Sequence, residues 1–234
     1  MIAPVPSATK PNNPRRRQNR IVTADPLTES CRTLLRRLSW KGNHSAKPIS
    51  MIGLTSCHSG EGVTTITHGL AQAAAASGEH SVLQVDFNLN HHKSSLDSRS
   101  QGPVGVADVL LQDVNWRDAV SETDIPGLSI LPAGRPCDDS DDAIDSQYLP
   151  ELITALKSSF DLVVADLPPA GEVSSALRIG RFLDGLVIVV ESEQTRREVV
   201  SRLKSQLECT GSNLLGVILN RRQQHLPDWL YELF

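Results

Sequence analysis

The chain has 234 residues, of which 39% are apolar and 21% are charged. This balance suits one globular domain with flanking tails, and it excludes a disordered chain or a collagen-like repeat. The longest apolar run, residues 186–190, is far shorter than the roughly 18 to 20 residues that span a bilayer. We therefore expect no transmembrane helix.

The formal net charge of −4 is unevenly distributed. Residues 1–20 contain five basic residues and no acidic one, which leaves about −9 for the rest of the chain. Because backbone affinity for nucleic acid depends on clustered cations, we expect no nucleic-acid partner. The four cysteines form no C-x-x-C pair, and no apolar stretch of a secretory signal follows the first residues. Both observations favour a reducing compartment, and the cytoplasm is the expected location.

The sequence divides into four regions. Residues 1–20 are rich in proline and arginine and predict a disordered basic arm, which is either a solvated tail or a contact for anionic lipid or an acidic partner. Residues 21–47 form an N-terminal helix and linker, with apolar residues at helical spacing and Thr28 as the expected cap. Residues 48–222 form the main domain. The apolar tail, residues 223–234, is expected to dock on the body or on a partner.

Short β-rich runs alternate with helical stretches throughout the main domain. This alternation predicts an α/β fold, a doubly wound and mostly parallel sheet with helices on both faces. We expect strands at 49–55, 81–85, 128–131, 162–165, 186–190 and 215–219, and helices at 63–77, 104–112, 148–158, 174–182 and 195–209. The acidic segment 137–145 predicts a solvated turn, with a cation site as the alternative.

A glycine-bearing segment connects the first strand to the first helix of this domain. Such a turn places backbone N–H groups and the positive end of a helix dipole around an anion. In the consensus phosphate loop, a lysine reaches the outer phosphates and a hydroxyl holds magnesium. Here Val63 stands at the lysine position, and the alternative is that the segment is only a tight connection. The residues expected to surround the phosphates are Ser59, Gly60, Glu61, Gly62, Val63, Thr64 and Thr65.

Two predicted strands end with a carboxylate. Asp86 follows the second strand, and Asp166 follows the strand at 162–165. In an open α/β sheet, ligands bind beyond the carboxyl ends of the strands, so we expect both carboxylates to lie beside the glycine loop.

Eight sequence blocks in the same order give the chain a recognisable pattern. They are residues 29–34, 60–62, 106–111, 131–134, 160–169, 184–190, 195–198 and 215–220. Together they resemble the kinase domain of the bacterial tyrosine kinases (BY-kinases) of capsule and exopolysaccharide production, of the CpsD/CapB type. These kinases are a branch of the phosphate-loop ATPases that includes the MinD and ParA proteins.

The resemblance implies a set of roles for the candidate residues. Gly60 to Thr65 would hold the phosphates of ATP, and Thr64 would hold Mg²⁺. Asp86 would assist the metal or the accepting hydroxyl, and Asp166 would be the metal-side carboxylate. Asn220 would contact the adenine.

The resemblance also implies partners. The helix that bears Glu29 and Arg32 is similar to the subunit-contact motif of the family, which implies a homo-oligomer. A membrane polysaccharide co-polymerase or adaptor protein is the implied partner, and it would hold the chain peripherally at the inner face of the cell membrane.

Three departures from the family pattern concern the chemistry. Val63 replaces the lysine, and Asn88 replaces the second acidic residue after the second strand. The tyrosine-rich tail of the family is missing, because Tyr148 and Tyr231 are the only tyrosines of the sequence. An amide cannot accept a proton as a carboxylate does. We therefore expect a nucleotide-binding protein with weak or no tyrosine kinase activity. The alternatives are a catalytically dead scaffold (a pseudokinase) and a positioning ATPase of the MinD/ParA type.

Overall fold

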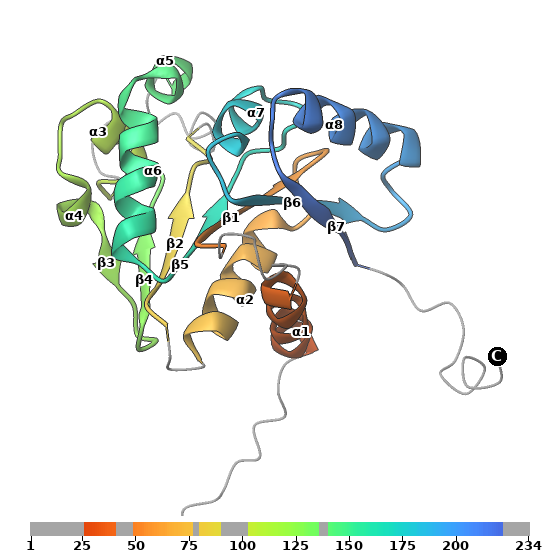
Figure 1. Cartoon of the computed structure of the whole chain (residues 1–234), viewed down its shortest axis with the longest axis horizontal. Helices are drawn as coiled ribbons and strands as arrows, with labels where there is room; N and C mark the ends of the chain where they lie inside the picture. Colours follow the sequence, from red (N-terminus) through yellow and green to blue (C-terminus); the bar gives the residue numbers. More distant parts are fainter. Residues whose placement is uncertain (1–25, 41–48, 77–79, 90–102, 136–139, 222–234) are drawn as a thin grey trace, which may run out of the picture.

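The computed structural model in Figure 1 describes residues 26–40, 49–76, 80–89, 103–135 and 140–221. The predictions for the basic arm, the linker and the C-terminal tail lie outside these residues. Within these ranges, every helix is too short or too polar to cross a membrane.

The described residues form one seven-stranded sheet, in the order β3-β4-β2-β5-β1-β6-β7. Only the edge strand β3 runs antiparallel to its neighbour β4. The predicted α/β class with a mostly parallel sheet is therefore confirmed. The strands are β1 (Met51–Ser56), β2 (Val82–Asp86), β3 (Ser121–Glu122), β4 (Leu128–Leu131), β5 (Leu162–Asp166), β6 (Gly185–Glu191) and β7 (Leu214–Asn220).

Helices cover both faces of the sheet (Figure 1). Residues of α1 and α2 belong to the apolar cluster on one face, and those of α3, α6, α7 and α8 belong to the cluster on the other. The helices are α1 (Pro26–Trp40), α2 (Val63–Ala75), α3 (Val106–Leu110), α4 (Trp116–Ala119), α5 (Ser140–Asp145), α6 (Tyr148–Ser159), α7 (Ser175–Gly180) and α8 (Arg197–Cys209).

The central strands lie where their sequences predict. β1 pairs with β5 on one side and with β6 on the other, and every residue of β1 is buried. A strand that is covered on both faces contains a continuous apolar run, and β5 and β6 have such runs. The arrangement brings the carboxyl ends of β2, β5 and β1 side by side.

Two local predictions are wrong. The described part of the acidic segment is the helix α5 and not a turn, because Arg178 of α7 donates to the carboxylates of Asp141 and Asp145 and reduces their repulsion. Thr28 is not a cap, because α1 begins at Pro26. Proline is favoured in the first helical turn, where its missing N–H has no intrahelical acceptor to lose.

Asp184, directly before β6, connects the amino end of β1 to α6. Its carboxylate accepts hydrogen bonds from the N–H groups of Ser50 and Met51, both at 2.9 Å, and from the ammonium of Lys157. Burial alone would raise the pKa of Asp184, but these hydrogen bonds outweigh it and hold the pKa below its ordinary value.

Asp184→Asn should therefore lower the free energy of unfolding at pH 7, by about 2 kcal/mol, because Lys157 and the two N–H groups lose a charged acceptor. A lowered folded-state pKa stabilises the protein above the unfolded value of about 4, and this contribution disappears as the pH falls through the folded pKa. Urea unfolding at pH 7 and at pH 3 should show a difference between parent and variant that shrinks in acid. A difference that stays constant would contradict this role.

Candidate phosphate-binding site

The connection between β1 and α2 depends on two glycines with left-handed backbones. Gly60 has φ 86° and Gly62 has φ 96°, a region that other residues seldom adopt. A Cβ atom on Gly62 would lie 2.2 Å from the Nδ2 atom of Asn220, so a side chain has no space there. The two glycines allow the chain to wrap closely around the first turn of α2.

The first turn of α2 presents free N–H groups to this loop. The first helical hydrogen bond runs from the N–H of Ile66 to the carbonyl of Gly62, and no side chain caps the helix. Among the described residues, nothing accepts from the N–H groups of Val63, Thr64 and Thr65. Unsatisfied donors at the positive end of a helix dipole are the groups that bind phosphate.

Glu61 lies within the loop, but its side chain turns into the protein. The side chain is buried, and its Oε2 atom accepts from the N–H groups of Cys57 at 2.7 Å and His58 at 2.9 Å. Its Oε1 atom accepts from the N–H of Glu191 at 3.2 Å and from the hydroxyl of Thr195. The carboxylate therefore ties the loop to the end of β6.

The segment after β5 holds the loop from another side. The hydroxyl of Thr55 donates to the carbonyl of Pro168 at 2.7 Å and accepts from the N–H of Ala170 at 3.1 Å. Glu172 accepts from the N–H of Ser59 at 3.0 Å. A Cβ atom on Gly171 would lie 2.2 Å from a backbone oxygen of the loop, so the two segments are in close contact.

Cys57, at the start of the loop, is fully buried. Burial and the nearby Glu61 carboxylate raise the pKa of its thiol to about 11. The thiol therefore stays protonated at neutral pH and is unsuited to nucleophilic chemistry.

The two predicted carboxylates lie directly opposite each other on neighbouring strands. Asp86 of β2 pairs in register with Asp166 of β5, which in turn pairs with Leu54 of β1. Asp166 is buried, and Asp86 is half-buried and accepts from the N–H of Asn88 at 2.8 Å. The structure thus brings both carboxylates to the sheet edge from which the loop leaves β1. With the exposed hydroxyl of Thr64, they supply the oxygen ligands that Mg²⁺ prefers, so the residues present fit this ion.

Asn220, at the end of β7, contacts the loop directly. Its Nδ2 atom donates to the carbonyl of Glu61 at 2.8 Å, and its Oδ1 atom accepts from the N–H of Arg221 at 2.9 Å. In this structure the Asn220 amide holds the loop. A contact with adenine stays a prediction.

Val63 is the first residue of α2, and its side chain is 8% exposed. It belongs to the apolar cluster that includes Ile52 and Leu54 of β1. The position at which the consensus loop has a lysine therefore contributes packing and no positive charge.

The helix of the predicted subunit contact lies against α2. Cys31 of α1 is buried beside Gly69 of α2, where the absent side chain allows close packing. Glu29 and Arg32 are exposed on α1, and their charged groups lie 3.6 Å apart. Their role in an oligomer stays a prediction.

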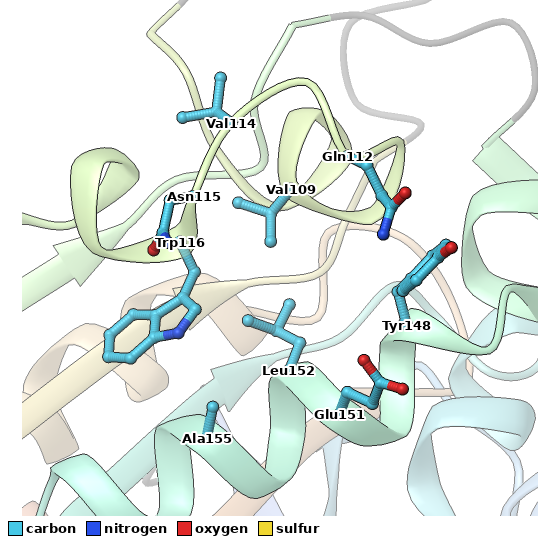
Figure 2. A pocket seen from close by; sticks show the side chains of 9 residues that line it. All are labelled: Val109, Gln112, Val114, Asn115, Trp116, Tyr148, Glu151, Leu152 and Ala155. Carbon is cyan, nitrogen blue, oxygen red and sulfur yellow. The ribbon is translucent and has the colours of Figure 1, made fainter.

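A cavity of about 480 Å³ lies away from the loop, between the α3–α4 segment and α6 (Figure 2). Trp116, Val109 and Leu152 line its apolar part, and Gln112, Tyr148 and Glu151 lie at its polar side. The lining includes no residue of the glycine loop, so this cavity is not the phosphate site.

Comparison with known proteins identifies one matching family model and several sequence relatives. A family model described as cellulose biosynthesis protein BcsQ matches residues 49–223. Tyrosine-protein kinase CpsD of Streptococcus agalactiae is 30% identical over 178 residues, which cover 76% of this chain and 77% of CpsD. Succinoglycan biosynthesis transport protein ExoP of Rhizobium meliloti is 26% identical over 212 residues, which cover 89% of this chain and 27% of ExoP.

Solved structures with a similar fold were also found. The chimerical protein CapA2B2 superposes with a TM-score of 0.75 and 27% identity, covering 86% of this chain and 87% of that one. The septum site-determining protein MinD of Pyrococcus horikoshii OT3, solved with Mg-ADP, has a TM-score of 0.57 and 25% identity, covering 78% and 76% of the two chains.

The sheet order, the glycine loop and these superpositions define a phosphate-loop NTPase fold. The family model and the sequence relatives then specify the group more closely. The chain belongs to the family of BcsQ and the CpsD-like bacterial tyrosine kinases, and its relatives are proteins of capsule and exopolysaccharide biosynthesis.

Proposed function

We propose that the chain binds ATP with Mg²⁺ at the glycine loop and serves capsule or exopolysaccharide biosynthesis with impaired tyrosine kinase activity. The observation that carries the proposal is the loop itself, whose free N–H groups at the start of α2 lie at the same sheet edge as Asp86 and Asp166. MinD, which shares the fold, was solved with Mg-ADP.

The impairment follows from the residue at position 63. A phosphate-loop lysine is a mobile cation that can follow negative charge as it develops on the transferred phosphoryl group. The apolar Val63 side chain cannot do this, so backbone N–H groups would bind the phosphates with less stabilisation of the transition state. Asn88, beside Asp86, cannot act as a second proton acceptor.

The same residues favour a second candidate, a pseudokinase that acts through its surface. Val63 is buried among apolar neighbours, as expected of a position that serves packing. A positioning ATPase of the MinD/ParA type is less well supported, because those proteins carry a lysine early in the loop and none lies between Met51 and Val63.

Titration with a fluorescent ATP analogue, with and without Mg²⁺, tests nucleotide binding, and a tyrosine phosphorylation assay separates the two candidates. We expect weak binding that Mg²⁺ strengthens, and phosphorylation far below that of a lysine-bearing relative. No binding at millimolar analogue would support the pseudokinase. Tight binding with rapid phosphorylation would contradict the impairment.

Asp166→Asn should remove most of the gain in analogue affinity that Mg²⁺ gives, because a neutral amide holds a divalent cation far less well than a carboxylate. Asp161→Asn is the matched control, since Asp161 precedes the same strand at its other end and bonds Ser81 there. An equal loss of Mg²⁺ dependence in both variants would contradict a metal role for Asp166.

We infer that a membrane polysaccharide co-polymerase or adaptor holds this chain at the inner face of the membrane. In ExoP the matching region is a part of a much longer transport protein, which supports a partnership of this kind. The exposed pair Glu29 and Arg32 would join copies of the chain. Sedimentation of the parent and of Arg32→Glu tests this assembly, and identical masses would contradict it.

A further inference from the structure

The last strand of the sheet leaves apolar side chains uncovered. β7 pairs only with β6, so one of its edges has no strand beside it in the described residues. Among those residues, three large apolar side chains are exposed, and two of them lie on β7: Val217 is 46% exposed and Leu219 is 64% exposed. An apolar edge strand without charged residues is a surface that proteins normally cover.

The two side chains lie on the face of the sheet that carries α8. Ile218 packs into the cluster on the opposite face, with α1 and α2. Because successive side chains of a strand alternate, Val217 and Leu219 point the other way. Leu203 and Leu207 of α8 are buried on this face, and Val199 and Val200 pack beside them, but α8 leaves Val217 and Leu219 exposed. We call Val217 and Leu219 the β7 strip.

The chain that follows β7 starts beside this strip. Arg221 has φ 53°, a left-handed backbone that redirects the chain, and its guanidinium bonds Glu191 at 2.9 Å. Residues 222–234 follow, and their apolar residues are spaced as on one face of a helix. These residues are Leu226, Trp229, Leu230, Leu233 and Phe234.

The dimensions of this segment fit the strip. The seven residues of β7 extend about 23 Å. The four residues 222–225 reach up to about 13 Å, enough for the chain to turn back over the strand.

Exposed charges lie at the start of α8, where Glu198 accompanies two arginines. α8 starts after Arg196, which is exposed, as is Arg197. The N–H of Ser192, after β6, donates to the carbonyl of Asn220 at 2.9 Å, so the connection to α8 and the end of β7 are neighbours. Asp228 and Glu232 of the segment carry the charge opposite to that of these arginines.

We propose that the apolar side chains of residues 226–234 pack on the β7 strip of the same chain.

The fluorescence of Trp229 tests whether the segment packs on the β7 strip. In the full chain with Trp40→Phe and Trp116→Phe, Trp229 is the single tryptophan. We expect blue-shifted emission and protection from acrylamide quenching, both independent of protein concentration. Adding Leu219→Glu should shift the emission to the red and raise quenching several-fold. Leu111→Glu is the matched control, because Leu111 is 46% exposed but lies next to α3, and it should change neither signal.

Three results would overturn the proposal. One is full accessibility of Trp229 to acrylamide in the protein without Leu219→Glu. Another is protection that Leu219→Glu leaves unchanged, which would place the segment elsewhere. The third is protection that grows with concentration together with a dimer mass in sedimentation, which would assign the strip to a second copy of the chain.

Discussion

Val63→Lys should strengthen binding of an ATP analogue by roughly 10- to 100-fold, the equivalent of about 1.5 to 3 kcal/mol for a hydrogen bond to a charged group. The N–H groups of the first turn of α2 already face the site, so the variant adds a cation to a loop that is otherwise built. The lysine stem can keep part of the packing of Val63 in the apolar cluster that includes Ile52 and Leu54, while its ammonium reaches solvent. Titration with the fluorescent analogue and Mg²⁺ measures the gain.

Val63→Met is the control for this prediction. Methionine gives a side chain of similar length without the charge, so it should leave the affinity of the analogue near that of the parent. An equal gain in both variants would mean that side-chain length, and not charge, limits binding. No gain with lysine would mean that another cation already reaches the outer phosphates, or that the loop does not bind nucleotide.

The parts of the fold that the sequence predicts well are those whose burial determines their composition. β1, β5 and β6 lie in the middle of the sheet, and their apolar runs are unambiguous. β3 has two exposed residues, Ser121 and Glu122, and its pairing with β4 leaves no pattern in the sequence. α5 depends on Arg178, which lies more than 30 residues further along the chain, so its local acidic sequence suggested repulsion.

The candidate site also contains residues that the sequence predicts and one whose role it does not. The glycines and the two strand-end carboxylates follow from local sequence, because the parallel topology brings strand ends together. The function of Glu61 does not follow from local sequence. Its partners Glu191 and Thr195 lie 130 and 134 residues away along the chain and become neighbours only in the folded protein. The sequence offered one signal, a carboxylate between two glycines of a phosphate loop, where it would repel an anion unless it turned inward.

Glu61→Ala should be the most destabilising change in the loop. The carboxylate is 3% exposed and accepts from three backbone N–H groups and the Thr195 hydroxyl. Its removal leaves several buried donors without a partner, which costs about 3 kcal/mol or more in the free energy of unfolding. For a domain of this size, that lowers the thermal midpoint by roughly 6 to 12 °C. Glu61→Gln should also destabilise, because donors face both oxygens and an amide nitrogen cannot accept from them.

Glu172→Ala is the matched control, because Glu172 also accepts from a loop N–H, that of Ser59, but is exposed. It should cost less than about 1 kcal/mol, since water can replace the lost acceptor. Thermal and urea unfolding of the three variants measure the difference. If Glu61→Ala and Glu172→Ala destabilise equally, the buried carboxylate does not hold the loop to β6. If Glu61→Ala also abolishes analogue binding under conditions in which it remains folded, the geometry of the N–H groups depends on this anchor.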